Sequence, residues 1–161
     1  MEITTSLPSS EVQLGPLLQI TMQGLIGLLV IVLSVRTALR RKREGRPHSW
    51  VPLMIPSAVF LGLFTSFGVH MFGALGGWPE SLGTHGFPEP LIVHGDIAFF
   101  VFSALLLGLM VGVPVGLVGC AAVDRLRSAT GPLGIYVACN IAALVLMHTL
   151  APGELLDWWW D

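Results

Sequence analysis

The chain has 161 residues, of which 53% are hydrophobic and only 11% are charged, and its formal net charge is −2. Soluble domains average about 25% charged residues, so this chain carries too few charges to cover a water-facing surface. The composition argues against a soluble helical bundle and predicts one all-α integral membrane domain over residues 1–161.

Four apolar stretches follow one another, near residues 14–35, 57–75, 97–122 and 133–150. Each reaches or approaches the ~20 residues that cross ~30 Å of hydrocarbon as a helix. Lipid offers no hydrogen bonds to the backbone, so each stretch is predicted to be a transmembrane helix. Pro114, inside the third stretch, is expected to kink that helix.

All eight Lys and Arg residues lie between the first and second stretches or between the third and fourth. The positive-inside rule therefore predicts that these two segments are cytoplasmic. Both termini and the loop over 76–96 are then expected on the outer side of a cell membrane, in a bacterium the inner membrane. Trp78 and the three tryptophans at 158–160 are expected in the aromatic belt on that side. The basic run after the first stretch is interpreted as a topology signal that contacts anionic lipid, with no nucleic-acid partner.

Small residues recur at every fourth position along the second and third helices, and such ridges let two helix backbones approach closely. We expect the two ridges to face each other or a neighbouring subunit. The residues assigned to this packing are Gly62, Gly108, Gly112 and Gly116. Gln19 and Gln23 on the first helix are expected to point into the bundle or at a partner, because an unpaired amide in lipid is costly.

Histidine is concentrated on the predicted outer side, which holds four of the five. Imidazole nitrogens bind transition metals and haem iron, so one alternative function is a membrane subunit that binds a metal or a b-type haem. The candidate ligands are His70, His85, His94 and His148. The plain alternative is that His70 and His148 hydrogen-bond to Asp96, to glutamines or to backbone carbonyls. A proton relay through His70 and Asp96 is a further alternative, since histidine titrates near neutral pH.

Two segments carry a family resemblance. Residues 61–75 read LGLFTSFGVHMFGAL, and residues 98–114 read AFFVFSALLLGLMVGVP. In their Gly-Leu pairs, hydroxyl residues and small-residue run, these segments resemble the second and third helices of the TolQ/ExbB/MotA proton-channel family. The predicted topology agrees with that resemblance, because the second helix runs outward and the third returns.

The resemblance implies a non-enzymatic subunit that transduces ion motive force and needs no cofactor. It also implies a homo-oligomer, a pentamer by family analogy, around a single-pass partner with a membrane aspartate. The pore hydroxyls that it implies are those of Thr65 or Ser66 and of Ser103, and His70 and Asp96 join them in the predicted proton path.

A third alternative is a non-catalytic accessory or assembly subunit of a membrane complex. The sequence contains no Gly-rich phosphate loop, no Gly-x-Ser-x-Gly elbow and no His-Glu-x-x-His motif. An enzyme with a soluble-type active site is therefore not predicted.

Overall fold

The computed structural model describes residues 14–79 and 83–160, and within these two ranges all regular structure is helical. In chain order the elements are α1 (Leu14–Arg43), α2 (Val51–Leu75), α3 (Glu89–Leu107), the π-helical turn η1 (Gly108–Gly112), α4 (Val113–Ala122), the 3-10 turn η2 (Asp124–Ala129), α5 (Thr130–Leu150) and α6 (Gly153–Trp160).

Four helical segments are long and apolar enough to cross a membrane, namely Leu18–Arg43, Val51–Leu75, Glu89–Ala122 and Leu126–Leu150. The all-α class is therefore confirmed, and so is the prediction of four helices long and apolar enough to span a membrane. The orientation of the termini stays a prediction. The helices run beyond the predicted bounds because backbone hydrogen bonding continues through polar residues that the hydropathy pattern leaves out. The end of α1 and the start of α3 are the clearest cases.

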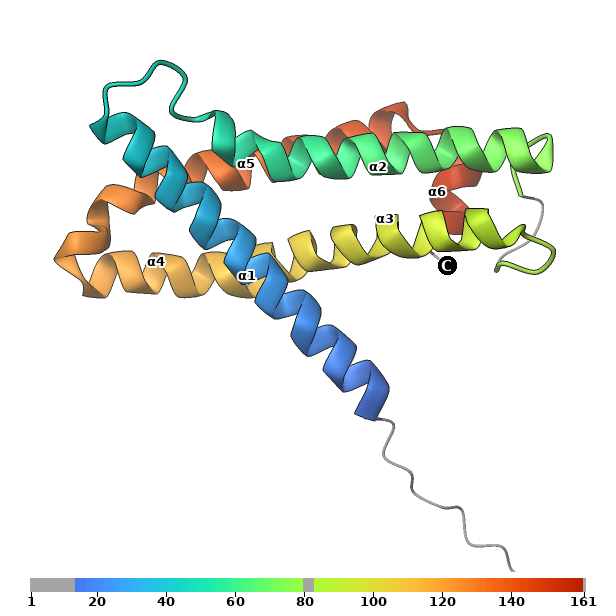
Figure 1. Ribbon diagram of the computed structural model, residues 1–161, viewed down its shortest axis with the longest axis horizontal. Coiled ribbons are helices and arrows are strands. Elements are labelled where there is room, and N and C mark those ends of the chain that lie inside the picture. The colour runs from blue at the N-terminus through green and yellow to red at the C-terminus, as the bar shows by residue number, and fades with distance from the viewer. Residues whose placement is uncertain (1–13, 80–82, 161) are drawn as a thin grey trace, which may run out of the picture.

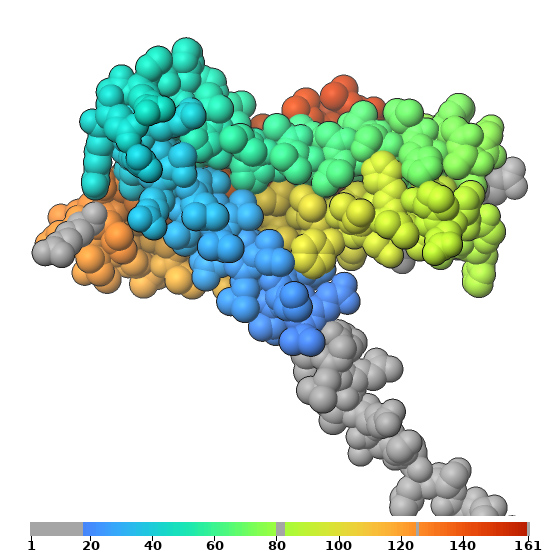
Figure 2. Space-filling model, viewed as in Figure 1, coloured from blue at the N-terminus to red at the C-terminus, as the bar shows by residue number. Residues whose placement is uncertain are grey.

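The helices form two layers (Figure 1). α2 and α5 lie side by side, while α3, η1 and α4 form one long helical path beside α2. Figure 2 shows that α1 crosses this path obliquely rather than running along it. α1 and α4 finish at one end of the bundle, which we call the basic end. The opposite end, which we call the acidic end, includes the carboxylates of Glu89, Asp96, Glu154 and Asp157 among the residues that the structure describes.

The small-residue ridge of the third span packs against α1, not against α2. A Cβ added to Gly27 of α1 would overlap the backbone oxygen of Ala104 on α3. A Cβ on Gly112 would come within 2.8 Å of the Ile31 side chain, so the two helices approach almost backbone to backbone.

The two ridges therefore do not face each other within one copy of the chain, and the alternative that a ridge faces a neighbouring subunit stays a prediction. Gly108 and Gly112 contact α1, and a Cβ on Gly116 would lie 3.2 Å from Leu133 of α5. Gly62 of α2 lies in open space, with no atom near its missing side chain. The physical reason is that α2 presents phenylalanines to the interior, and the width of their rings keeps the backbones of α2 and α3 apart.

Pro114 is accommodated by a change in helical pitch. Just before it, the Val113 N–H donates to the carbonyl of Gly108, five residues earlier, so the chain makes one wide π-helical turn. A proline provides no N–H and crowds the preceding turn, and a π turn removes that conflict without ending the helix. The predicted disturbance of the third span is thus a change of hydrogen-bond register over Gly108–Gly112.

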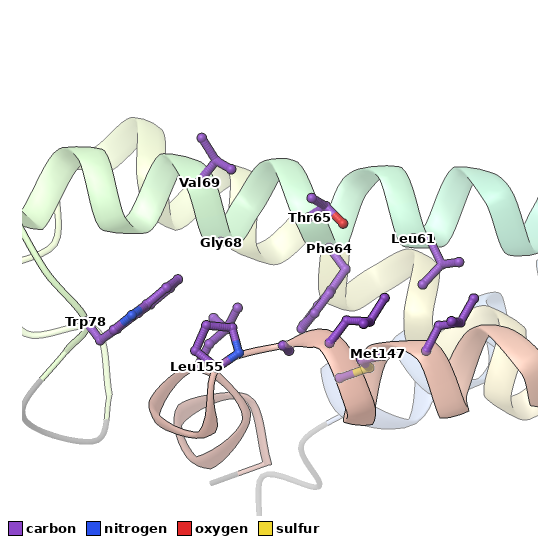
Figure 3. A pocket seen from close by; sticks show the side chains of 12 residues that line it. Leu61, Phe64, Thr65, Gly68, Val69, Trp78, Met147 and Leu155 are labelled. Carbon is purple, nitrogen blue, oxygen red and sulfur yellow. The ribbon is translucent and has the colours of Figure 1, made fainter.

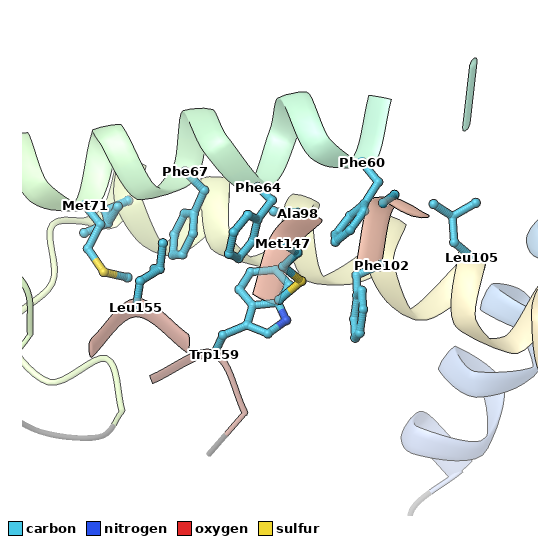
Figure 4. Close-up of a cluster of buried hydrophobic side chains, with 12 residues drawn as sticks. Phe60, Phe64, Phe67, Met71, Ala98, Phe102, Leu105, Met147, Leu155 and Trp159 are labelled. Carbon is cyan, nitrogen blue, oxygen red and sulfur yellow. The ribbon is translucent and has the colours of Figure 1, made fainter. Parts of the chain in front are cut away.

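The acidic half of the bundle has an aromatic core that α6 completes (Figure 4). After Pro152 the chain turns back, and Trp159 of α6 reaches between the spans to contact Phe64 at 5.1 Å and Phe102 at 5.7 Å between ring centroids. Trp159 is only 5% exposed, whereas Trp160 is 52% exposed. The expectation that all three C-terminal tryptophans lie in an interfacial belt is therefore wrong for Trp159, which is a core residue.

Candidate functional site

A pair of histidines joins α2 to α3 in the acidic half of the bundle. The Nδ1 atoms of His70 and His94 lie 3.1 Å apart, and Nε2 of His94 lies 3.1 Å from the Ser66 hydroxyl oxygen. That hydroxyl in turn donates to the backbone carbonyl of Leu63 at 3.0 Å. These contacts form a continuous row of hydrogen bonds from the Leu63 carbonyl to the His70 ring, which we call the histidine row.

The proton count determines the other hydrogen bonds once the Ser66 hydroxyl hydrogen points to the Leu63 carbonyl, which is its orientation in the histidine row. Ser66 has a single hydroxyl hydrogen, which it donates to Leu63, so it must accept a hydrogen bond from the Nε2–H of His94. A neutral His94 then has a lone pair on Nδ1, and His70 must donate its own Nδ1–H to that lone pair. Nε2 of His70 consequently keeps a lone pair, which has no partner among the residues that the structure describes.

Helical spacing brings the row together. Ser66 and His70 are four residues apart, so they occupy one face of α2, and His94 meets both from α3. His70 lies five residues before the end of α2, or ~7.5 Å along the helix at ~1.5 Å per residue. His70 and His94 are half-buried and Ser66 is exposed, so the row lies at the surface of the α2–α3 pair.

Two further residues fix the ring of His94, and sequence reasoning missed both. The fully buried Phe67 ring meets the His94 ring edge-on at 5.7 Å between centroids. Gly95 allows this approach, because a Cβ there would lie 3.0 Å from Cε2 of Phe67. In the sequence, Phe67 directly follows Ser66 and Gly95 directly follows His94. Whether these two pairs of residues meet depends on how α2 and α3 are rotated about their axes, which the sequence does not give.

The other two candidate histidines lie elsewhere. His148 donates from Nδ1 to the carbonyl of Leu144 at 2.9 Å, and its ring stacks on Trp160 at 5.5 Å. This matches the plain alternative of a backbone hydrogen bond for His148. His85 lies exposed in the segment between α2 and α3. Over residues 14–79 and 83–160, no group of three or more His, Cys, Asp or Glu side chains is placed to hold one metal ion.

Asp96 is not the partner of His70. It follows His94 by two residues, which turns it by roughly 200° around α3 at ~3.6 residues per turn. It lines a separate hollow of about 230 Å³, together with Phe99 and Trp158. The direct relay from His70 to Asp96 is therefore replaced by the contact between His70 and His94.

The three hydroxyls implied by the family resemblance also face different places. Ser66 belongs to the histidine row, whereas Thr65 lines an apolar hollow of about 360 Å³ between α2, α5 and α6 (Figure 3). Ser103 lines a third hollow beside Gln19 and Gln23 of α1. Within one copy of the chain the three hydroxyls do not share a path.

Comparison of this chain with protein-family models, with curated proteins and with solved structures gave no match. The geometry of the histidine row is therefore the principal basis for a functional proposal.

Proposed function

We propose that this chain is a multi-pass membrane subunit that moves protons, with His70 and His94 as the groups that carry them. The observation that supports the proposal is the histidine row, in which two imidazoles 3.1 Å apart are joined to a serine hydroxyl. Imidazole takes up and releases protons near neutral pH, and it can do so at either nitrogen.

The hydrogen-bond directions suggest one transfer sequence. A proton binds the lone pair on Nε2 of His70, and the Nδ1 proton of that ring passes to Nδ1 of His94. The Nε2 proton of His94 then passes to the Ser66 oxygen, which must release its own hydroxyl hydrogen to a water or to a group of a neighbouring subunit, because the Leu63 carbonyl accepts a hydrogen bond but not a proton. Two imidazolium rings at this distance would repel each other, so the pair holds one extra proton at a time rather than two.

The proposed setting follows the sequence-based topology. The positive-inside rule puts the acidic end on the outer side of a cell membrane, so His70 would take its proton from that side. Since Thr65, Ser66 and Ser103 face three places in one subunit, a complete path requires a homo-oligomer or another membrane subunit. The resemblance to the TolQ/ExbB/MotA family implies a similar assembly.

The test is proton flux into liposomes that contain the purified chain and a pH-sensitive dye, driven by a potassium diffusion potential. We expect His70→Gln to slow the flux about tenfold or more, because a positioned proton-transfer group contributes about 10²-fold or more to rate. His148→Gln is the matched control, since it removes an exposed histidine near the same end. Since a complete path requires an assembly, the chain is reconstituted as its oligomer, together with any membrane subunit that co-purifies with it. Flux through that wild-type assembly no faster than through protein-free liposomes contradicts the proposal.

A second candidate is a metal or haem subunit, favoured by the free Nε2 of His70. A metal-binding histidine commonly donates its other N–H to an acceptor, as His70 donates to His94. Two nitrogens that bind one ion at ~2.0–2.1 Å lie about 3–3.5 Å apart in octahedral or tetrahedral geometry, so the 3.1 Å between the two Nδ1 atoms fits a shared ion as well as a hydrogen bond. The hydrogen-bonded arrangement leaves Nε2 of His70 as the available ligand. Under this candidate the metal sits on Nε2, with further ligands from a partner. A Soret band or stoichiometric metal that His70→Gln removes would support it.

A further inference from the structure

The basic end of the bundle contains a hollow with two chemically different parts. It lies between α1, α4 and α5 and has a volume of about 530 Å³. Its lining includes apolar residues of α4, η2 and α5, among them Gly116, Leu126 and Leu133, which we call the floor, and three arginines of α1, which we call the rim.

The rim arginines are Arg36, Arg40 and Arg43, at positions i, i+4 and i+7 of one helix face. Arg36 lies seven residues before the end of α1, or about 10 Å deeper at ~1.5 Å per residue. Guanidinium groups at successive depths beside an apolar surface extend towards the membrane surface and need anionic partners there.

The acidic groups near this rim neutralise little of its charge. Arg40 and Arg46 both pair with Glu44 at 2.8 Å, and Arg127 pairs with Asp124 at 3.1 Å. The hydrogen bond from Arg40, together with the nearby Arg46, holds the pKa of Glu44 below its ordinary value, so this carboxylate stays charged. Glu44 and Asp124 are the only acids in the two basic segments, against eight Lys and Arg, so a net positive charge remains.

We infer that this hollow binds an anionic phospholipid, with an acyl chain along the apolar floor and the phosphate at Arg36, Arg40 and Arg43. Arginine suits this role because its planar fork donates two parallel hydrogen bonds to a phosphate. The apolar floor distinguishes the site from one for free phosphate, which would gain nothing from Leu126 or Leu133. Basic pockets between membrane helices are a recurrent way to hold anionic headgroups.

The test is native mass spectrometry of the full chain in detergent, with equal amounts of phosphatidylglycerol and phosphatidylcholine. We expect the wild type to retain more phosphatidylglycerol than phosphatidylcholine. Replacing Arg36, Arg40 and Arg43 together by Gln should reduce that preference about tenfold or more, since each basic residue near a headgroup contributes ~1 kcal/mol and ~1.4 kcal/mol is tenfold.

The matched control replaces Arg41, Lys42 and Arg46 by Gln, which removes the same number of charges from the same region but none from the rim. It should keep most of the preference. A second variant, Leu126→Trp, fills the hollow from an exposed position and leaves every arginine in place, and it should weaken retention of the lipid.

Three outcomes would overturn the inference. The wild type could bind both lipids equally, which removes the case for an anionic site. The two triple variants could lose the preference to the same extent, which indicates a diffuse basic surface. Inorganic phosphate at millimolar concentration could displace the lipid completely, which indicates a site for the free anion.

Discussion

Gly95 of α3 lies directly against the ring of Phe67 on α2, and the same ring contacts His94 edge-on. A Cβ at Gly95 would lie 3.0 Å from Cε2 of Phe67 and 3.3 Å from Cζ. The histidine row therefore depends on a glycine that carries no functional group, because this glycine sets how closely α2 and α3 approach.

The first prediction concerns that glycine. Gly95→Val should push Phe67 aside and lower stability by about 1–3 kcal/mol, as overpacking of a filled core does. It should also break the contact between His70 and His94, which ¹⁵N NMR of the imidazoles in detergent would detect. Gly62→Ala is the control: its Cβ meets open space, so stability should stay equal or rise by up to ~1 kcal/mol. Equal stability of the two variants would contradict the packing argument.

The second prediction concerns proton positions within the row. In the neutral protein, ¹⁵N NMR should find His70 protonated at Nδ1 and His94 at Nε2, since Ser66 donates its only hydrogen to Leu63. Ser66→Ala removes the acceptor for His94 and should leave that ring as a mixture of tautomers. Thr65→Val, one residue away and outside the row, should leave both assignments unchanged. A wild type with His94 protonated at Nδ1 would refute the assigned directions.

The third prediction concerns the crossing of α1 and α3. Gly27→Ala places a methyl group onto the backbone oxygen of Ala104, which no rotamer change can relieve. We expect a loss of about 1–3 kcal/mol in unfolding free energy, and α1 should become more susceptible to proteolysis. Gly24→Ala, one turn earlier on the same helix, meets no atom within 4 Å and should be neutral or slightly stabilising.

The fourth prediction concerns α6. Trp159→Ala removes the ring that contacts Phe64 and Phe102, and it should destabilise the chain by about 3–5 kcal/mol. Trp160→Ala removes a half-exposed ring and should cost less than about 1 kcal/mol. Unfolding midpoints in denaturant compare the two variants directly. Similar midpoints would mean that α6 does not belong to the core.

The sequence predicts the four spans well because mean hydropathy over ~20 residues reports directly on membrane crossing. It predicts α6 poorly because eight residues are too short for a span, and a tryptophan near a membrane end is usually interfacial. Burial of Trp159 depends on the turn at Pro152, which directs α6 back into the bundle.

The candidate site was predicted only in part, because contacts between helices depend on their rotation and axial offset. His70 and His94 were both candidates, but their pairing requires the particular offset that Gly95 and Phe67 set. The same limit applies to the glycine ridges. Spacing identifies Gly108 and Gly112 as close-packing residues but does not say that their neighbour is α1.

The directions of the hydrogen bonds in the histidine row affect how soon a second proton could follow the first in the proposed transfer. After one proton has passed in that transfer, His70 would carry its hydrogen on Nε2 and His94 would carry its hydrogen on Nδ1, so both hydrogen bonds of His94 would point the opposite way. The same heavy-atom positions hold both arrangements, with the Ser66 hydroxyl rotated from the Leu63 carbonyl towards His94. After a transfer these hydrogen bonds of the row would therefore stay reversed until they are reset. A second proton in the same direction must wait until both rings and the hydroxyl reset, so the reset, rather than the transfer itself, would set the pace.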